Sequence, residues 1–319
     1  MLDSMRDQQP DALPPQDMLG ESLITEQLNP RTTNIDELPV IDILRLMNEE
    51  DQRVARAVEK ELPRIAAAVE AIVERLRRGG RLFYVGAGTS GRLGVLDAVE
   101  CPPTFGTPPG MIEAIIAGGP DACWRAVEGA EDDARAGAAA INARSVTAQD
   151  AVVGLTASGR TPFTLGALEE ARHSGALTIA IACNPRPAIA QFADISITPV
   201  VGPEVIAGST RLKAGTAQKM ILNMLSTVTM IQLGYTYGNM MSNLQPRSEK
   251  LRHRARAILR ARFDLSDEQA ARLLDQAGGD VKVALVMKAT GTSLAEAQRA
   301  LTAAQRSVKR AIEKLRRGS

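Results

Sequence analysis

Cysteine and histidine are scarce in this sequence of 319 residues, and their scarcity limits the metal and redox chemistry it can support. The three cysteines are odd in number and widely spaced. Together with the two histidines they form no ligand spacing of a known zinc type. We therefore predict no metal site and a reduced protein whose thiols are structural. The residues concerned are Cys101, Cys123, Cys183, His173 and His253.

The sequence also lacks an excess of charge of one sign and any long apolar run. Lysine and arginine number 38 against 37 aspartates and glutamates, and a net charge of +1 indicates neither nucleic acid nor an anionic membrane as a partner. The clearly apolar runs fall short of the roughly 18 residues of a spanning helix. The polar, proline-rich N-terminal segment lacks the apolar stretch of a secretory signal, so a cytoplasmic location is predicted. Residues 1–27 are expected to form a disordered tail.

The spacing of apolar residues changes at Gly79–Gly80. From Ile41 to Arg78 it is helical, and beyond the glycines short apolar runs alternate with helix-like stretches. The runs cover residues 81–85, 112–117, 151–155, 177–182 and 194–198, and the helix-like stretches cover 91–99, 121–143 and 162–173. This alternation is typical of a parallel sheet with helices on both faces. We predict a doubly wound, flavodoxin-like α/β fold with five parallel strands.

No further strand is expected after about residue 200. Residues 215–234 predict one largely buried helix, and the charged sequence beyond Leu251 predicts three or four more, with starts near Ser266 and Ser293. The predicted organisation is an α/β domain with N-terminal helices over residues 28–250, followed by a small helical domain over residues 251–319.

The segment "GAGTSGRLG" at residues 86–94 has the glycine spacing of a dinucleotide-binding turn. Such a turn also requires an acidic residue about 20 positions later, at the end of the next strand. The next apolar run ends instead in Ala117, Gly118 and Gly119. Thr89 and Ser90 place hydroxyl donors beside the N–H groups of a helix start, which suits one compact phosphate group. We therefore favour a phosphate site over a dinucleotide site.

A second turn, "TASGRTP" at residues 156–162, resembles the first, and both contain Ser-Gly-Arg. Two such loops at neighbouring strand ends could hold one anion from two sides. The alternative is that both are ordinary βα turns whose hydroxyls cap helices. The predicted phosphate-binding residues are Thr89, Ser90, Gly91, Ser158, Gly159, Arg160 and Thr161, with Ser209 and Lys213 as further candidates for sugar or structural contacts.

These loops resemble the phosphate-binding loops of the sugar isomerase (SIS) fold, and three longer motifs are more specific. They are "LDAVECPPTFG" at 96–106, "AVEGAEDD" at 126–133 and "GSTRLKAGTAQK" at 208–219. Together they resemble the N-acetylmuramic acid 6-phosphate etherase family, a relative of the glucokinase regulatory protein, from about residue 28 to the C-terminal helices. The resemblance implies a cytoplasmic lyase of peptidoglycan recycling. It would convert N-acetylmuramic acid 6-phosphate into N-acetylglucosamine 6-phosphate and D-lactate without a cofactor or a metal.

Cleavage of this ether requires acid–base groups beside a phosphate anchor, because the lactyl oxygen is a poor leaving group. The accessible route is elimination from the open-chain aldehyde, followed by addition of water at C3. The resemblance implies that Glu100 is the acid that protonates the departing lactate. It implies that Glu131 is the second active-site glutamate, with removal of the C2 proton as its expected role. Without the resemblance, both are solvated acids, as we expect of Glu128, Asp132 and Asp133.

Functions of other classes remain as alternatives. A non-catalytic sugar-phosphate sensor that regulates a partner protein would share the phosphate loops but would not need Glu100 and Glu131. An aldose–ketose isomerase would not need the motifs at 96–106 and 208–219. A DNA-binding regulator would need a basic helix-turn-helix segment before residue 80, where the charge is mixed. By analogy with relatives of this fold, we expect a homodimer with the site near its interface.

Overall fold

The computed structural model describes residues 23–243 and 249–317. Of the disordered tail predicted over residues 1–27, residues 1–22 lie outside this part. The remainder of that prediction is wrong, because Ile24–Glu26 form a 3₁₀ turn, η2. Thr25 within it is buried, its N–H donates to Asn184 Oδ1 (3.3 Å), and its hydroxyl accepts from Asn184 Nδ2 (3.0 Å). These contacts hold the segment against the folded domain.

Five parallel strands form the central sheet in the order β2-β1-β3-β4-β5. They are β1 (Leu82–Gly86), β2 (Ile112–Ile116), β3 (Ala151–Leu155), β4 (Leu177–Ile181) and β5 (Ile195–Ile197). Each overlaps one predicted apolar run, which confirms the predicted doubly wound sheet. Strands β1 and β3 are neighbours, paired from Leu82↔Ala151 to Gly86↔Leu155. The loops that follow these two strands therefore lie side by side.

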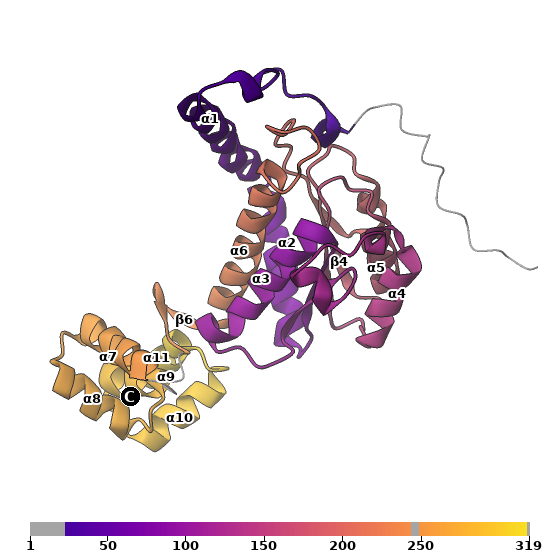
Figure 1. Cartoon of the computed structure of the whole chain (residues 1–319). Coiled ribbons are helices and arrows are strands. Elements are labelled where there is room, and N and C mark those ends of the chain that lie inside the picture. The colour runs from indigo at the N-terminus through magenta and orange to yellow at the C-terminus, as the bar shows by residue number, and fades with distance from the viewer. Residues whose placement is uncertain (1–22, 244–248, 318–319) are drawn as a thin grey trace, which may run out of the picture.

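Helices cover both faces of the sheet (Figure 1). The core on one face is shared with α1 (Val40–Glu59), α2 (Leu62–Arg77), α3 (Gly88–Phe105) and α6 (Lys213–Leu233). The core on the other face is shared with α4 (Ala134–Ala143) and α5 (Pro162–His173). Successive residues of each strand point to opposite faces, so Leu82 and Tyr84 belong to the first core and Phe83 and Val85 to the second.

Two of the helix predictions are wrong in extent. Helix α3 continues past residue 99 and through Pro102 and Pro103. It tolerates them because the missing N–H groups fall near its last turn, which closes with the Gly106 N–H on the Pro102 carbonyl (2.7 Å). The stretch 121–143 is helical only in its second half, since Gly129 takes a positive φ of 74° and starts a separate turn. Besides η2, the short 3₁₀ turns of the described residues are η3 (Ile35–Glu37), η4 (Pro120–Cys123), η5 (Ala130–Asp132) and η6 (Ala188–Phe192).

A small hairpin and a separate helical core follow α6. The hairpin strands, β6 (Thr236–Tyr237) and β7 (Met240–Met241), correct the expectation that strands end near residue 200. Residues 249–317 form five helices, more than predicted, with a core of their own. They are α7 (Glu249–Phe263), α8 (Asp267–Gln276), α9 (Val281–Thr290), α10 (Leu294–Ala303) and α11 (Val308–Arg317). Within the described ranges, no helix is long and apolar enough to cross a bilayer.

Candidate active site

A pocket of about 350 Å³ opens beside the carboxyl ends of β1 and β3. Both Ser-Gly-Arg loops reach it, as the sequence predicts for two loops that converge. Of the predicted site residues, the pocket is lined by Thr89, Ser90, Glu131, Ser158 and Thr161. The wall is completed by Glu26, Ala87, Gly88, Arg92, Ala117, Ala122, Ala126, Val127, Glu128, Ala130, Ala157 and Thr210.

The first loop places the N-terminus of α3 at the pocket. Gly91 does not line the wall but lets the helix approach the strand closely. A Cβ at Gly91 would lie 2.7 Å from the Gly86 carbonyl oxygen. The buried Ser90 side chain donates its Oγ proton to Gln218 Oε1 of α6 at 2.9 Å. Thr89 and Ser90 of this helix start line the pocket, and the N–H groups of a helix start are a common anion site in proteins.

The second loop is held by its own hydroxyls. Thr156 Oγ1 lies 2.8 Å from Thr161 Oγ1 and accepts the N–H of Gly159 at 3.1 Å. Gly159 takes a φ of 79°, which favours glycine, and lies against Pro187 outside the pocket wall. Thr161 precedes Pro162, the first residue of α5, so a second helix N-terminus faces the pocket. Arg160 is half-buried and is not part of the wall.

Arg92 lines the pocket, although it is not among the predicted site residues. Its Nε donates to the Ala122 carbonyl (2.8 Å) and its guanidinium also reaches the Arg125 carbonyl (3.2 Å). These bonds fasten α3 to the segment that carries Glu128 and Glu131. The available signal was the Ser-Gly-Arg repeat itself, whose first arginine is this residue.

The two predicted catalytic glutamates have different positions. Glu131 lies in η5, just after Gly129, and faces the pocket. Glu128, predicted to be a surface charge, is exposed and also lines the pocket. Glu100 is exposed on α3 and is not part of the wall. It lies nine residues beyond Gly91, about 14 Å along the helix axis, so the described chain does not bring the two glutamates together.

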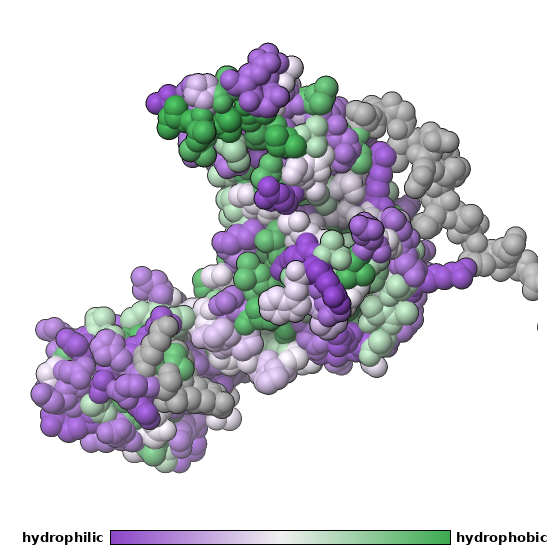
Figure 2. Space-filling view, viewed as in Figure 1, coloured by the Kyte–Doolittle hydropathy of each residue, from purple (hydrophilic) through white to green (hydrophobic). Residues whose placement is uncertain are grey.

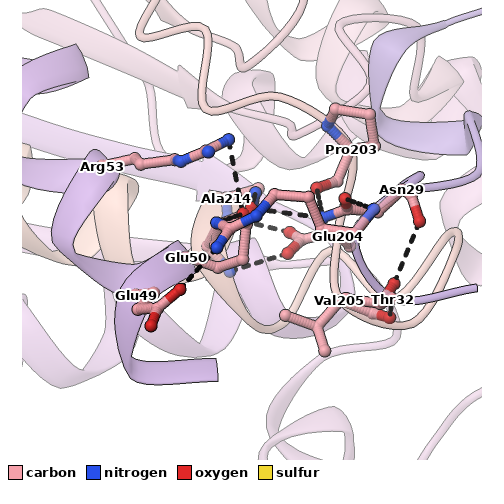
Figure 3. A network of polar contacts seen from close by, with 11 residues as sticks. Asn29, Thr32, Glu49, Glu50, Arg53, Pro203, Glu204, Val205 and Ala214 are labelled. Atoms are coloured by element: carbon pink, nitrogen blue, oxygen red, sulfur yellow. Dashed lines mark hydrogen bonds and ion pairs between the residues drawn. The ribbon is translucent and has the colours of Figure 1, made fainter. Parts of the chain in front are cut away.

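Lys213 and Ser209, the remaining candidates, also lie outside the pocket wall. Lys213 is fully buried, and its Nζ lies 2.5 Å from Glu50 Oε2 of α1. The backbone N–H of Lys213 donates to Glu204 at 2.9 Å, so this carboxylate caps α6 (Figure 3). Of the two roles expected for Lys213, sugar contact or structural contact, the structural one therefore fits its position. Thr210, between Glu204 and Lys213, is the residue of this segment that lines the pocket.

The cluster around Glu50 joins three segments that are far apart in sequence. Glu50 also accepts hydrogen bonds from Arg31 (2.6 Å) and Asn29 (3.2 Å) of the N-terminal segment. Burial acts to raise the pKa of Glu50, but the hydrogen bonds from Lys213 and Arg31 outweigh it and lower this pKa. No spacing in the sequence relates Glu50 and Glu204 to Lys213, so neither carboxylate was predicted.

The sequence matches known families over most of its length. Residues 64–172 match the glucokinase regulatory protein N-terminal SIS domain, and residues 135–228 match the SIS domain. The N-acetylmuramic acid 6-phosphate etherase of Rhizobium rhizogenes is 52% identical over 292 residues, which cover 92% of this chain and 95% of that relative. The etherase of Symbiobacterium thermophilum is 56% identical over 269 residues, covering 84% and 89%.

A phosphoheptose isomerase from Francisella tularensis superposes with a TM-score of 0.46 and 22% identity, covering 61% of this chain and 100% of its own. The sequence relatives are much nearer, since they share about half of their residues over nearly the whole chain. The chain therefore belongs to the N-acetylmuramic acid 6-phosphate etherase family.

Proposed function

We propose that the protein is a carbon–oxygen lyase that cleaves the D-lactyl ether of N-acetylmuramic acid 6-phosphate. The products are N-acetylglucosamine 6-phosphate and D-lactate. The observation that carries the proposal is the pocket at β1 and β3, where hydroxyls at two helix N-termini share one wall with Glu131. The etherase name of the relatives supports the substrate. We propose the cytoplasm as its compartment, because a charged sugar phosphate does not cross a bilayer unaided.

The hydroxyl end of the pocket is suited to the 6-phosphate. Thr89 and Ser90 stand at the start of α3, and Ser158 and Thr161 stand before α5. Unpaired N–H groups and the positive dipole ends of both helices favour an anion there. Arg92 adds a cation to the same wall. The phosphate then holds C2 and C3 of the open-chain sugar toward the segment that carries Glu131.

The elimination requires two proton transfers, and the addition of water reverses both. Glu131 removes the C2 proton, the C2–H electrons form a C2=C3 double bond, and the C3–O bond to lactate breaks. Glu100 donates a proton to the leaving lactate oxygen. Glu100, now ionised, takes a proton from water as the water oxygen adds to C3, and the protonated Glu131 returns a proton to C2. Both carboxyl groups are thereby restored, and one water is consumed for each lactate released. General acid–base catalysis of this kind contributes roughly 10²–10⁴-fold for each group.

We further propose that the protein is a homodimer and that the acid comes from the second copy. Glu100 is exposed and does not line the pocket of its own chain, and its neighbours Leu96 and Val99 are 48% and 57% exposed. Helix α1 also exposes apolar residues, which gather on one side in Figure 2 and include Val40, Ile41 and Leu44. A second copy that covers these faces would remove apolar surface from water and bring its Glu100 to the site.

The reaction is tested by incubating the protein with N-acetylmuramic acid 6-phosphate in D₂O and following the products by NMR. Wild type should release lactate and carry deuterium at C2 of the product. Glu100→Ala should lose lactate release by about 10²–10⁴-fold yet still exchange the C2 proton, whereas Glu131→Ala should lose both. Asp132→Asn, an exposed neighbour outside the pocket wall, is the matched control. Binding without release or exchange would favour the sensor instead.

Mixing two inactive variants tests the shared site. If Glu100 acts on the other chain's pocket, subunit exchange between Glu100→Ala and Glu131→Ala gives heterodimers with one intact site each. Random exchange would restore roughly a quarter of the wild-type sites. No recovery despite a dimeric mass and proven exchange would place both glutamates of a site on one chain. A monomeric mass at micromolar concentration would contradict the dimer.

A further inference from the structure

The Ser90 hydroxyl, which the proposed function assigns to phosphate binding, is hydrogen-bonded away from the pocket. Its Oγ donates to Gln218 Oε1 at 2.9 Å. Gln218 belongs to the second turn of α6 and is only 1% exposed. Its Nε2 has no hydrogen-bond partner among the described residues. A buried amide donor without a partner is costly and calls for an explanation.

A serine hydroxyl carries one proton and two lone pairs. While that proton is donated to Gln218, it is not available to a phosphate oxygen. An amide turned through 180° offers its N–H to the serine oxygen instead, and the hydroxyl proton is then free for the ligand. The turned amide leaves its carbonyl oxygen unpaired, which is less costly than an unpaired N–H. The same two side chains can therefore form two arrangements, one of which is suited to an anion in the pocket.

The backbone of α6 is held firmly just before Gln218. Glu204 accepts the N–H groups of Lys213 and Ala214 at 2.9 and 3.0 Å, and the Lys213 side chain pairs with Glu50. A change at Gln218 is thus confined to its side-chain amide. Because a leucine or methionine would fill this buried position without an unpaired donor, packing alone does not account for the glutamine.

We propose that Gln218 is a positioning residue for substrate binding. It turns its amide so that Nε2 donates to Ser90 Oγ, and the Ser90 hydroxyl then donates its hydrogen bond to the ligand's phosphate. This inference rests on the proposed function, since it deepens the phosphate site. It assigns the recognition of a phosphate monoester dianion in part to a residue that the ligand does not touch. Its effect should fall on binding and KM more than on kcat, because the acid–base groups are elsewhere.

The test compares Gln218→Met and Gln218→Glu with Thr229→Val. Thr229 is buried in the same helix and lies outside the pocket wall, and its hydroxyl also has no partner in the described ranges. Affinity for N-acetylglucosamine 6-phosphate is measured by calorimetry from pH 5 to 8, as a ratio to wild type at each pH. We expect about threefold or greater loss for Gln218→Met, independent of pH, and wild-type affinity for Thr229→Val. An ionised carboxylate only accepts, so Gln218→Glu should lose at least about tenfold at pH 8. That loss should shrink as the pH falls, because a protonated carboxyl can donate as the amide does.

Ser90→Ala and the double variant Ser90→Ala/Gln218→Met separate this inference from the proposed function. If Gln218 acts through Ser90, the double variant binds no more weakly than Ser90→Ala. Wild-type affinity in Ser90→Ala would overturn the phosphate assignment of the loop, and this inference with it. Loss in Ser90→Ala with wild-type affinity in Gln218→Met, or a pH-independent deficit in Gln218→Glu, would overturn the role of Gln218 alone.

Discussion

Among the described residues, the α/β domain and the C-terminal helical domain each bury one lysine, and they stabilise its ammonium group in different ways. Lys213 lies against the carboxylate of Glu50. Within the described part of the chain, Lys282 has no carboxylate in hydrogen-bond contact, and its Nζ donates to the carbonyls of Gly234 (3.1 Å) and Arg306 (2.9 Å). Burial lowers the pKa of Lys282 to about 8. Both lysines join distant segments, but only the first joint carries a residue of the pocket wall, Thr210.

This difference indicates separate roles for the two sets of contacts, those of Lys213 and those of Lys282, which we call joints. The Lys213 cluster fixes the start of α6 and the segment before it, so its loss should affect both stability and substrate binding. The Lys282 contacts fasten α9 to the end of α6, at Gly234. Among the described residues, none of the range 249–317 lines the pocket. The second joint should therefore matter to stability alone.

The largest effect is expected from Glu50→Ala, which leaves the Lys213 ammonium buried without its counter-ion. The free energy of unfolding should fall by about 3–5 kcal/mol, and KM should rise because Thr210 loses its support. Urea unfolding and steady-state kinetics measure the two. Glu49→Ala is the control: its side chain is 56% exposed and its pair with Arg31 is at the surface, so less than about 1 kcal/mol is expected. Equal free energies of unfolding for the two variants would show that the ion pair between Glu50 and Lys213 does not stabilise the fold.

A smaller effect concerns the buried Asp97 of α3, which receives hydrogen bonds from Tyr84 (3.0 Å) and Ser226 (3.1 Å). Burial raises its pKa to about 6, against the lowering effect of these bonds. Between about pH 4 and 6 the folded state thus binds more protons than the unfolded state. The free energy of unfolding should fall as the pH rises through this window, by about 2–3 kcal/mol from this group.

Asp97→Asn should remove that contribution. The measurement is the urea midpoint at several pH values between 4 and 7, taken as the difference between variant and wild type, so that other titrating groups cancel. A difference that does not change with pH would show that Asp97 titrates normally.

The smallest effect is expected from Lys282→Met. The folded pKa of this lysine lies below its ordinary value, so the unfolded state binds more protons between about pH 8 and 10.5, and wild-type stability should rise with pH there. The variant loses this rise together with two hydrogen bonds, and at pH 7 its stability should stay within about 1 kcal/mol of wild type. Its kcat/KM should be unchanged. A fall in kcat/KM without unfolding would give the C-terminal domain a part in the site.

The local features of the fold were largely predictable from the sequence. The five strands coincide with short apolar runs, and α5 occupies residues 162–173 as predicted, because Pro162 favours its first turn and Gly175 follows its end. Both hydroxyl loops were found because their residue types and their position after a strand are properties of neighbouring residues. Their convergence required one further fact, that β1 and β3 pair directly.

The rest depended on tertiary contacts. Glu50 and Lys213 are 163 residues apart, and no periodicity reports that they form a pair. Glu128 was known as a charge, but only the path of the chain after β2 brings it to the pocket, where Arg92 of α3 binds the carbonyls of Ala122 and Arg125. The position of Glu100 on an exposed face is likewise set by how α3 packs. Sequence by itself determined which segments are strands, helices and anion-binding turns, because these follow from local spacing and backbone chemistry. The pairing of the buried charged side chains was decided by the packing of distant elements. A buried charge needs a partner in contact with it, and residues far apart in the sequence come into contact only in the folded structure.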